Sequence, residues 1–240
     1  MPLEGKVALV TGASRGLGRA IALAFAGEGA ALALCARREE ALQQVAGEVR
    51  RLGRRVLAVP ADVRSPRDLE RLVALTLEGF GRVDILVNNA SELGPTPLPY
   101  LADYPTAAFD DVLQVNVVAP FRLTQALIGG MLLRDQGVII NVTSDAAITG
   151  YPGWGAYAVS KAAIEGLTRT WAAELAHTGI RIHAVDPGDM DTDMHRAAIP
   201  DADRSELARP DNVARAFVRL VTTRDPDSAG RRLEAAALGR

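Results

Sequence analysis

Residues 11–18 read Thr-Gly-Ala-Ser-Arg-Gly-Leu-Gly, between an apolar run at Lys6–Thr11 and a helical pattern at Gly16–Gly29. Glycine lets the chain turn sharply and lets a phosphate approach the backbone. The N-terminus of the following helix offers free N–H groups and the positive end of its dipole to a pyrophosphate. A tight strand–helix connection without a ligand would use the same glycines. The residues expected at a dinucleotide phosphate site are Gly12, Ser14, Arg15, Gly16, Leu17 and Gly18.

Short aliphatic runs alternate with longer amphipathic patterns along the chain. This alternation predicts a parallel sheet with helices on both faces. The expected strands are Lys6–Thr11, Ala31–Ala36, Arg55–Val59, Val83–Asn88, Gly137–Ser144, Ile180–Asp186 and, more weakly, Arg232–Ala236. The expected helices are Gly16–Gly29, Glu39–Leu52, Pro66–Phe80, Thr106–Leu133, Ala156–His177 and Asp211–Thr222. Two irregular stretches, Asn89–Pro105 and Gly188–Pro210, follow strand ends, where open α/β sheets bind ligands. We expect the second, over 188–210, to form a short substrate lid.

The composition is that of an ordinary globular domain. Hydrophobic residues make up 48% and charged residues 23% of 240 residues, which favours one domain over 1–240. The net charge of −2 supplies no positive field for nucleic acid or an anionic membrane. Cys35 is the only cysteine, which suits a reducing compartment. No uninterrupted apolar run approaches the roughly 18 residues of a membrane span, and residues 1–6 lack the features of a signal peptide. We therefore expect a cytoplasmic protein with no nucleic-acid and no membrane partner.

The end of the second expected strand indicates which dinucleotide binds. Sites that prefer NAD place an acid there to bind the ribose 2′-hydroxyl. Ala36 occupies this position and is followed by Arg37 and Arg38. Their guanidinium groups, and that of Arg15, can pair with a 2′-phosphate. The alternative is a solvated helix start, although basic residues there oppose the helix dipole. The pattern favours NADP(H) over NAD(H).

Tyr157-Ala158-Val159-Ser160-Lys161 begins a long helical pattern. Residues four apart share one helix face, so Tyr157 and Lys161 point the same way. A phenol has a pKa near 10, which a nearby ammonium lowers by stabilising the phenolate. Tyr157 is therefore a candidate general acid for carbonyl reduction, or general base for alcohol oxidation. The alternative for the isolated pair is an exposed tyrosine beside a solvated lysine.

Two further polar residues complete the expected catalytic set. Ser144 ends the fifth strand, where its hydroxyl can hold the substrate oxygen beside the phenol; otherwise it caps a strand end. Asn116 lies in an apolar helical stretch, and a buried asparagine needs hydrogen-bond partners. We expect Asn116 to hold a water that relays protons to Lys161, or else to mark a structural kink.

Together these residues resemble the single-domain short-chain dehydrogenase/reductase family over nearly the whole chain. The matching motifs are Thr11–Gly18, Asp62-Val63, Asn88-Asn89-Ala90, Asn116, Ser144, Tyr157, Lys161, and Pro187-Gly188 followed by Thr192. The resemblance implies an α/β fold with a Rossmann-like, doubly wound parallel sheet of about seven strands in the order 3-2-1-4-5-6-7. It also implies an NADPH-dependent oxidoreductase of small carbonyl compounds or alcohols, assembled as a homodimer or homotetramer through the fourth and fifth helices.

The same resemblance implies individual cofactor contacts. Adenine is expected against Asp62 and Val63, the adenosine ribose at Asn88, Asn89 and Ala90, the nicotinamide ribose at Tyr157 and Lys161, and the carboxamide near Pro187, Gly188 and Thr192.

The sequence departs from the family pattern at several positions. Ser91 stands where glycine is usual, and Asp189 follows Pro187-Gly188 where an apolar residue is usual. Asp189, Asp191 and Asp193 alternate, a pattern that a hard metal ion uses, but such acids are more often solvated. We therefore expect no metal.

The substrate is less constrained by the sequence than the cofactor. Reductases of acyl chains on an acyl carrier protein resemble one another in two basic residues, whose counterparts here are Asp135 and Thr178. This argues against a carrier-bound substrate. Glu92, Asp145 and Asp189 follow strand ends near the expected mouth and would favour neutral or cationic carbonyl compounds, unless they are solvated or paired with arginine. Two alternatives stay open: an NAD-linked alcohol dehydrogenase on the same fold, and a catalytically silent NADPH-binding scaffold or regulator.

Overall fold

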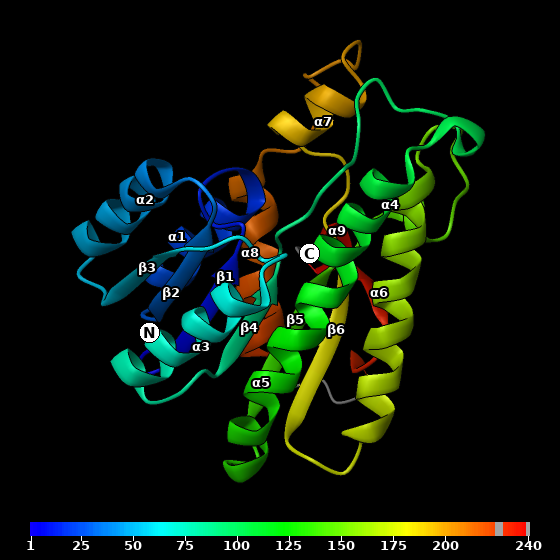
Figure 1. The fold of residues 1–240 in the computed structure, drawn as a ribbon. Helices are drawn as coiled ribbons and strands as arrows, with labels where there is room; N and C mark the ends of the chain where they lie inside the picture. The colour runs from blue at the N-terminus through cyan, green and yellow to red at the C-terminus, as the bar shows by residue number, and fades with distance from the viewer. Residues whose placement is uncertain (224–227, 239–240) are drawn as a thin grey trace.

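Seven short strands form one parallel sheet in the computed structural model, which describes residues 1–223 and 228–238 (Figure 1). The domain expected over 1–240 thus includes residues 224–227 and 239–240, which lie outside the described residues. The strands are β1 Val7–Thr11, β2 Ala31–Ala36, β3 Val56–Pro60, β4 Ile85–Asn88, β5 Gly137–Val142, β6 Ile180–Asp186 and β7 Arg232–Glu234. Their order is β3-β2-β1-β4-β5-β6-β7, and every neighbouring pair is parallel. The predicted fold class and strand order are confirmed.

Two layers of helices cover the sheet, one on each face. The first layer contains α1 Gly16–Gly27, α2 Glu39–Arg51 and α8 Pro210–Thr222, and the fully buried Phe25 and Phe217 fill its core. The second layer contains α3 Pro66–Phe80, α5 Ala119–Leu133 and α6 Gly155–Glu174. Because successive strand residues face opposite layers, Val10 belongs to the first core and Leu9 to the second. This double burial explains why the strands read as continuous apolar runs.

The shorter elements lie mainly at the carboxyl ends of the strands. They are η1 Leu101–Asp103, α4 Thr106–Leu113, the π-turn η2 Gln114–Val118, η3 Asp145–Ala147, α7 Asp193–Ala198 and α9 Ala235–Leu238. Helix α7 lies within the expected lid, where the sequence predicted no helix. Thr192 caps its N-terminus by accepting a hydrogen bond from the Nα of His195 at 3.2 Å. Figure 1 shows α7 above the edge of the sheet at which the strands end.

The helix predicted over Thr106–Leu133 is interrupted. The π-turn at Gln114–Val118 separates α4 from α5, and Pro120 lies in the first turn of α5. Proline has no N–H, so one helical hydrogen bond is missing near the wider turn. Among the described residues, this run is also the one helical segment long and apolar enough to cross a membrane by length and composition. Half of its most apolar window is buried within the fold, as in the core helix of a globular domain.

Strand β5 ends two residues before the predicted end at Ser144. Ser144 has an extended backbone and caps η3, since its Oγ accepts a hydrogen bond from the Nα of Ala146 at 3.2 Å. The chain therefore turns at Ser144 and leaves the sheet.

Candidate cofactor and catalytic site

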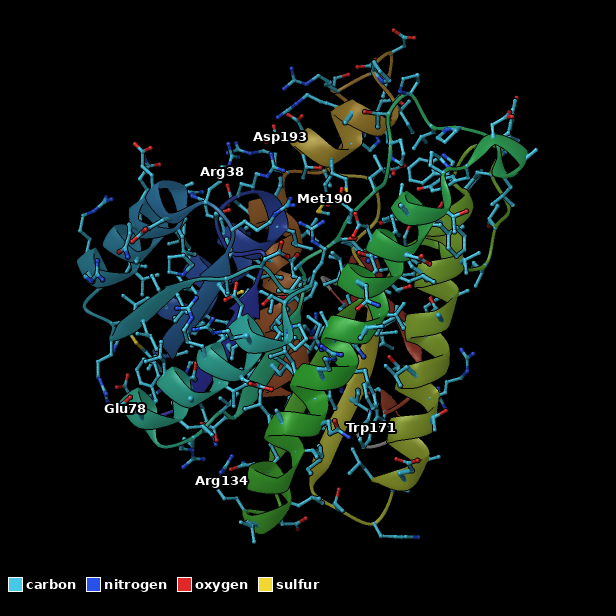
Figure 2. All side chains as sticks on the ribbon, in the orientation of Figure 1. Arg38, Glu78, Arg134, Trp171, Met190 and Asp193 are labelled. Carbon is cyan, nitrogen blue, oxygen red and sulfur yellow. The ribbon has the colours of Figure 1, made fainter. Side chains whose placement is uncertain are left out.

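A cleft of about 630 Å³ opens at the carboxyl ends of the strands, a volume suited to a small molecule or cofactor. Figure 2 shows Arg38, Met190 and Asp193 near this end of the molecule, and Arg134 at the opposite end. The predicted residues that line the cleft are Gly12, Ser14, Arg15, Gly16, Leu17, Arg37, Arg38, Asp62, Val63, Asn89, Ala90, Tyr157, Lys161, Pro187 and Thr192. The predicted residues outside its lining are Gly18, Asn88, Asn116, Ser144 and Gly188.

The glycine turn brings the start of α1 against the end of β1. Gly12 and Gly16 have φ angles of +65° and +52°, which side chains other than glycine rarely adopt. A Cβ atom on Gly18 would lie 2.3 Å from the carbonyl oxygen of Gly12. Helix α1 has no side-chain cap at Arg15 and no acidic residue in its first turn. Its first N–H groups therefore remain available to an anionic ligand, which fits the pyrophosphate of a dinucleotide.

Thr11 and Asn89 lock the glycine turn to the loop after β4. The Thr11 Oγ1 accepts hydrogen bonds from the Nα of Asn89 and of Ala90, both at 3.0 Å. The Asn89 Nδ2 donates in return to the Thr11 carbonyl at 2.9 Å. A Cβ on Gly12 would lie 2.9 Å from the Cα of Ala90. The two predicted motifs therefore form one rigid wall of the cleft, and Thr11 has a structural part that its place in the motif did not reveal.

Asn88 points away from the cleft. Its side chain is buried and donates from Nδ2 to the Oδ1 of Asn141 at 2.8 Å. Asn141 donates in turn to Thr168 on α6 at 2.8 Å. Asn88 thus connects β4, β5 and α6 beneath the site.

Two of the three arginines expected at a 2′-phosphate, Arg15 and Arg37, pair with acids from distant segments. The Nη1 of Arg15 lies 2.8 Å from the Oδ2 of Asp193 in α7, and the Nη2 of Arg37 lies 3.7 Å from the Oε2 of Glu92. Both arginine side chains are more than half exposed, and exposed ion pairs are weak. A phosphate can therefore displace either acid at little cost. Glu92 lies at this end of the cleft rather than at the substrate mouth.

Asp62, expected at the adenine, is paired within its own loop. Its carboxylate receives the Nη2 of Arg64 at 2.7 Å. This hydrogen bond holds the pKa of Asp62 below its ordinary value, against a smaller opposing effect of burial.

Tyr157 and Lys161 lie on the inner face of α6 and are almost fully buried. The Nζ of Lys161 donates to the Val142 carbonyl at 2.9 Å and lies 5.3 Å from the centre of the Tyr157 ring. Burial lowers the pKa of Lys161 to about 8, although the negative charge of Asp186 opposes this. Burial also raises the pKa of Tyr157 well above its ordinary value, while a hydrogen bond with Ser144 opposes the rise. This direction is opposite to the lowering by Lys161 that the sequence predicted, because burial of the phenol dominates. The alternative of an exposed tyrosine beside a solvated lysine does not describe this pair.

Ser144 borders the same region from the end of β5. Its Oγ donates to the Oδ1 of Asp145 at 2.9 Å, and the hydroxyl of Tyr151 donates to the other carboxylate oxygen at 2.7 Å. Burial disfavours the charged form of Asp145, but these hydrogen bonds outweigh it and hold the pKa of Asp145 below its ordinary value. A negative charge is therefore fixed beside Ser144.

The side chain of Asn116 occupies the π-turn and is buried. Its Oδ1 accepts from the Nα of Glu92 at 2.7 Å, and its Nδ2 donates to the Glu92 carbonyl and to the Ser160 Oγ, each at 2.9 Å. Both amide hydrogens are thus used within the fold. Asn116 connects the loop after β4 to α6 at the place where the helix is irregular.

The acids within 188–210 contact basic side chains of the same segment. The Nε2 of His195 lies 3.7 Å from the Oδ1 of Asp189, and Arg196 pairs with Asp191 at 2.6 Å and also with Asp193. In the part of the chain that the structure describes, no group of three or more His, Cys, Asp or Glu side chains is arranged for a metal ion. Residues 188–210 also supply cleft residues that the sequence reasoning missed. They are Met190, Asp193, Met194 and Arg196.

Known proteins share this architecture. The family model described as short chain dehydrogenase matches residues 6–203. The 3-oxoacyl-(acyl-carrier-protein) reductase FabG of Thermotoga maritima is 36% identical over 230 residues, covering 92% of each chain. An NAD⁺-bound xylitol dehydrogenase has a TM-score of 0.86 at 30% identity, covering 97% of this chain and 98% of that one. A variant of actinorhodin polyketide ketoreductase with NADPH has a TM-score of 0.87 at 32% identity, covering 98% and 97%.

Proposed function

The chain belongs to the short-chain dehydrogenase family, whose members are NAD(P)H-dependent oxidoreductases, and from this premise we propose that it reduces a small ketone or aldehyde with NADPH, or oxidises the corresponding alcohol. The observation that carries the proposal is the buried Tyr157–Lys161 pair in the lining of a cleft whose other end carries Arg15, Arg37 and Arg38.

The proposed chemistry divides hydride and proton between cofactor and chain. Bound NADPH would supply the hydride to the carbonyl carbon. Tyr157 supplies the proton to the carbonyl oxygen, because its raised pKa keeps the phenol protonated at neutral pH. Ser144 orients that oxygen by turning its hydroxyl proton from Asp145 to the substrate. Lys161 stabilises the phenolate that remains and binds the nicotinamide ribose. In alcohol oxidation the same groups act in reverse.

Asn116 is proposed to act through position. Its side-chain hydrogens are used by Glu92 and Ser160, so a water that serves Lys161 would bind to its backbone carbonyl rather than to its amide. A π-turn replaces the i→i+4 hydrogen bonds of an α-helix by i→i+5 bonds and is frequent at functional sites. Through its hydrogen bond to Ser160, Asn116 holds the π-turn Gln114–Val118 against α6.

The cofactor contacts are proposed from the family resemblance together with the residues that line the cleft. Ser14 and the first turn of α1 would hold the pyrophosphate, and Arg15, Arg37 and Arg38 the 2′-phosphate. Asp62 and Val63 would border adenine, and Asn89 and Ala90 the adenosine ribose. Pro187, Gly188 and Thr192 would border the nicotinamide.

NADPH preference has a direct test, since similar structures include both an NAD⁺ complex and an NADPH complex. In Arg37→Asp, the carboxylate repels a 2′-phosphate and accepts hydrogen bonds from a 2′-hydroxyl. The ratio of kcat/KM for NADPH to that for NADH should invert. Arg51→Asp, at the other end of α2, is the matched control and should leave the ratio unchanged. Equal losses with both cofactors in Arg37→Asp would contradict the assignment.

Substrate, assembly and location complete the proposal. We propose that the single domain carries its substrate lid at 188–210 and acts on a free small molecule, because Asp135 and Thr178 replace the basic residues expected for a carrier protein.

Assembly as a dimer or tetramer through the Thr106–Leu133 and α6 helices is supported by Phe121, which stacks on Trp171 with ring centres 6.4 Å apart and stays 37% exposed. A cytoplasmic location fits the single, reduced Cys35.

The decisive experiment is NADPH consumption with a panel of aldehydes, ketones, diketones and quinones. Tyr157→Phe should lower kcat by about 10²–10⁴-fold while NADPH binding stays nearly intact. Lys161→Ala should weaken both, because the ammonium has two roles. Tyr100→Phe is the matched control, since Tyr100 is 68% exposed and outside the cleft lining. Wild-type turnover in Tyr157→Phe would refute the mechanism, and an inert wild type that binds NADPH would favour the scaffold alternative.

A further inference from the structure

Two buried carboxylates and a partly buried arginine form a network near Tyr157 and Lys161 that the proposed chemistry does not use. Asp186 at the end of β6 is 7% exposed, and Glu165 on α6 is 5% exposed. Arg232 on β7 bridges them: its Nη2 pairs with the Oδ2 of Asp186, and its Nε lies 3.2 Å from the Oε1 of Glu165. Buried charges persist only when they are paired, so the three side chains act as one unit.

This network connects the two sides of the active site. The Oδ1 of Asp186 accepts a hydrogen bond from the Nα of Gly188 at 2.9 Å, which fixes the turn expected at the nicotinamide. Glu165 accepts a hydrogen bond from the Thr143 Oγ1 at 2.8 Å. Glu165 also lies one helical turn after Lys161, so Tyr157, Lys161 and Glu165 share one face of α6. Arg232 therefore joins the cofactor-side turn to the catalytic helix.

The sheet places Asp186 close to the support of the ammonium. Lys161 donates to the carbonyl of Val142, and Val142 pairs with Val185 across β5 and β6. Asp186 is the next residue along β6. The Val142 carbonyl, which accepts from the Lys161 ammonium, and the Asp186 carboxylate therefore lie at the ends of neighbouring strands.

We propose that Asp186, held by Arg232, which also pairs with Glu165, is a positioning residue for the Tyr157–Lys161 pair: it fixes the turn at Gly188 against α6 and keeps a negative charge beside the ammonium. This inference rests on the proposed function, because it presupposes that Tyr157 and Lys161 perform the proton transfer. It makes the short strand β7, which lies outside the cleft lining, a working part of the site.

The charges around the pair support this assignment. Burial lowers the pKa of Lys161, and Asp186 is the group that opposes this effect. Its own pKa is raised by burial, against the hydrogen bond from Gly188 and the charge of Arg232. The charged groups that face Tyr157 or Lys161, or support those that do, are Asp186 from β6, Asp145 from η3, Asp189 from the loop after β6, Glu165 from α6 and Arg232 from β7.

The test is the pH profile of Asp186→Asn. The amide can still accept the hydrogen bond from Gly188, so the variant removes the charge and keeps the turn. Loss of the Lys161 proton should end carbonyl reduction at alkaline pH, so kcat/KM should fall on the alkaline side of its pH profile. Without Asp186, the pH at which this fall occurs should be about one unit lower. Relative to wild type, kcat/KM should then fall about tenfold at pH 9 and less than about twofold at pH 6.

A ligand-free measurement accompanies the kinetics. In the apoprotein, the free energy of unfolding, measured with urea, should begin to rise with pH where folded Lys161 loses its proton. In Asp186→Asn this onset should also move about one pH unit lower. Because Asp186→Asn leaves Arg232 with one fewer carboxylate, the double variant Asp186→Asn/Arg232→Gln removes both charges and should show a shift in the same direction.

Glu234→Gln is the matched control. Glu234 is the exposed partner of Arg232, at 3.5 Å from its Nη1, and its replacement should move neither the alkaline fall in kcat/KM nor the unfolding onset. If folded Asp186→Asn and the double variant both keep the wild-type profile while Tyr157→Phe is inactive, the inference is wrong and the proposed function stands. Wild-type turnover in Tyr157→Phe would overturn both. A uniform loss of activity at all pH values, with no shift, would reduce Asp186 to a structural residue and also overturn the inference.

Discussion

Replacing Lys161 by methionine should stabilise the ligand-free protein at neutral pH while abolishing its activity. Lys161 is 3% exposed, and burial lowers its pKa from an ordinary 10.5 to about 8. A folded state that lowers the pKa of a lysine disfavours its charged form. At about 1.4 kcal/mol per pKa unit, keeping the ammonium buried costs roughly 3 kcal/mol below pH 8. Methionine is of similar length, fills the same space and carries no charge.

One interaction is lost in Lys161→Met. The Val142 carbonyl loses the ammonium that donates to it at 2.9 Å. An acceptor left without its partner costs roughly 1–2 kcal/mol. The net expectation is a variant that is about 1–2 kcal/mol more stable than wild type at pH 7.

The difference in stability between Lys161→Met and wild type should change with pH in a defined direction. Between about pH 8 and 10.5, unfolded Lys161 binds a proton that the folded state has lost, so wild-type stability rises with pH by up to about 1.4 kcal/mol per pH unit relative to the variant. The advantage of Lys161→Met should shrink and then reverse near pH 10. Urea unfolding of both proteins from pH 7 to pH 10 measures this, and the difference cancels every group that titrates in both. A variant less stable than wild type at pH 7, or a difference that stays constant with pH, would refute the reasoning.

Three further predictions concern other parts of the fold. Gly18→Ala should lower stability by roughly 1–3 kcal/mol, because its Cβ would lie 2.3 Å from the Gly12 carbonyl oxygen; thermal unfolding measures the loss, and Gly27→Ala, with nothing within 4 Å of its Cβ, should show none. Burial raises the pKa of Cys35 to about 12, so a thiol reagent at pH 8 should label it only after urea unfolding, and rapid labelling of the native protein would contradict its burial. Asp145 fixes a negative charge beside Ser144, so a neutral ketone should have a higher kcat/KM than its carboxylated analogue at low salt, and Asp145→Asn should narrow the ratio. Equal rates for the two ketones would dismiss the effect of Asp145.

The sheet was predictable because its information is local and repeated. Strands β1 to β6 are largely apolar runs that alternate with helical patterns, and the right-handed connection of parallel strands leaves few possible orders. The break at Gln114–Val118 was not predictable in the same way, since the apolar pattern continues through it. Asn116 stabilises that turn through Glu92, 24 residues away, and such a partner is visible only once the chain has folded.

For the site, too, local patterns were predictable from the sequence and tertiary contacts were not. The rule that ligands bind at strand ends brought Gly12, Arg37 and Asn89 correctly to one cleft. The direction of each side chain depends on tertiary contacts, so Asn88 points to Asn141 instead of the cleft. Arg15 meets Asp193 across 178 residues of sequence, a pairing that no local pattern contains.

Burial of the charged Asp186 and Lys161 side chains lowers the stability of the fold in the pH range where the site is expected to work. Asp186 has a folded pKa raised above its unfolded value, so its favourable contribution to stability is complete only at acidic pH and is lost as the pH rises through the folded pKa. Lys161 has a lowered folded pKa, so its unfavourable contribution persists until the pH exceeds about 8. Between these limits both groups are charged and both oppose folding, and their mutual attraction offsets only part of that. Evolution commonly tolerates such losses at active sites. The cost is consistent with a pair kept for proton transfer, because a purely structural core would be more stable with apolar residues at both positions.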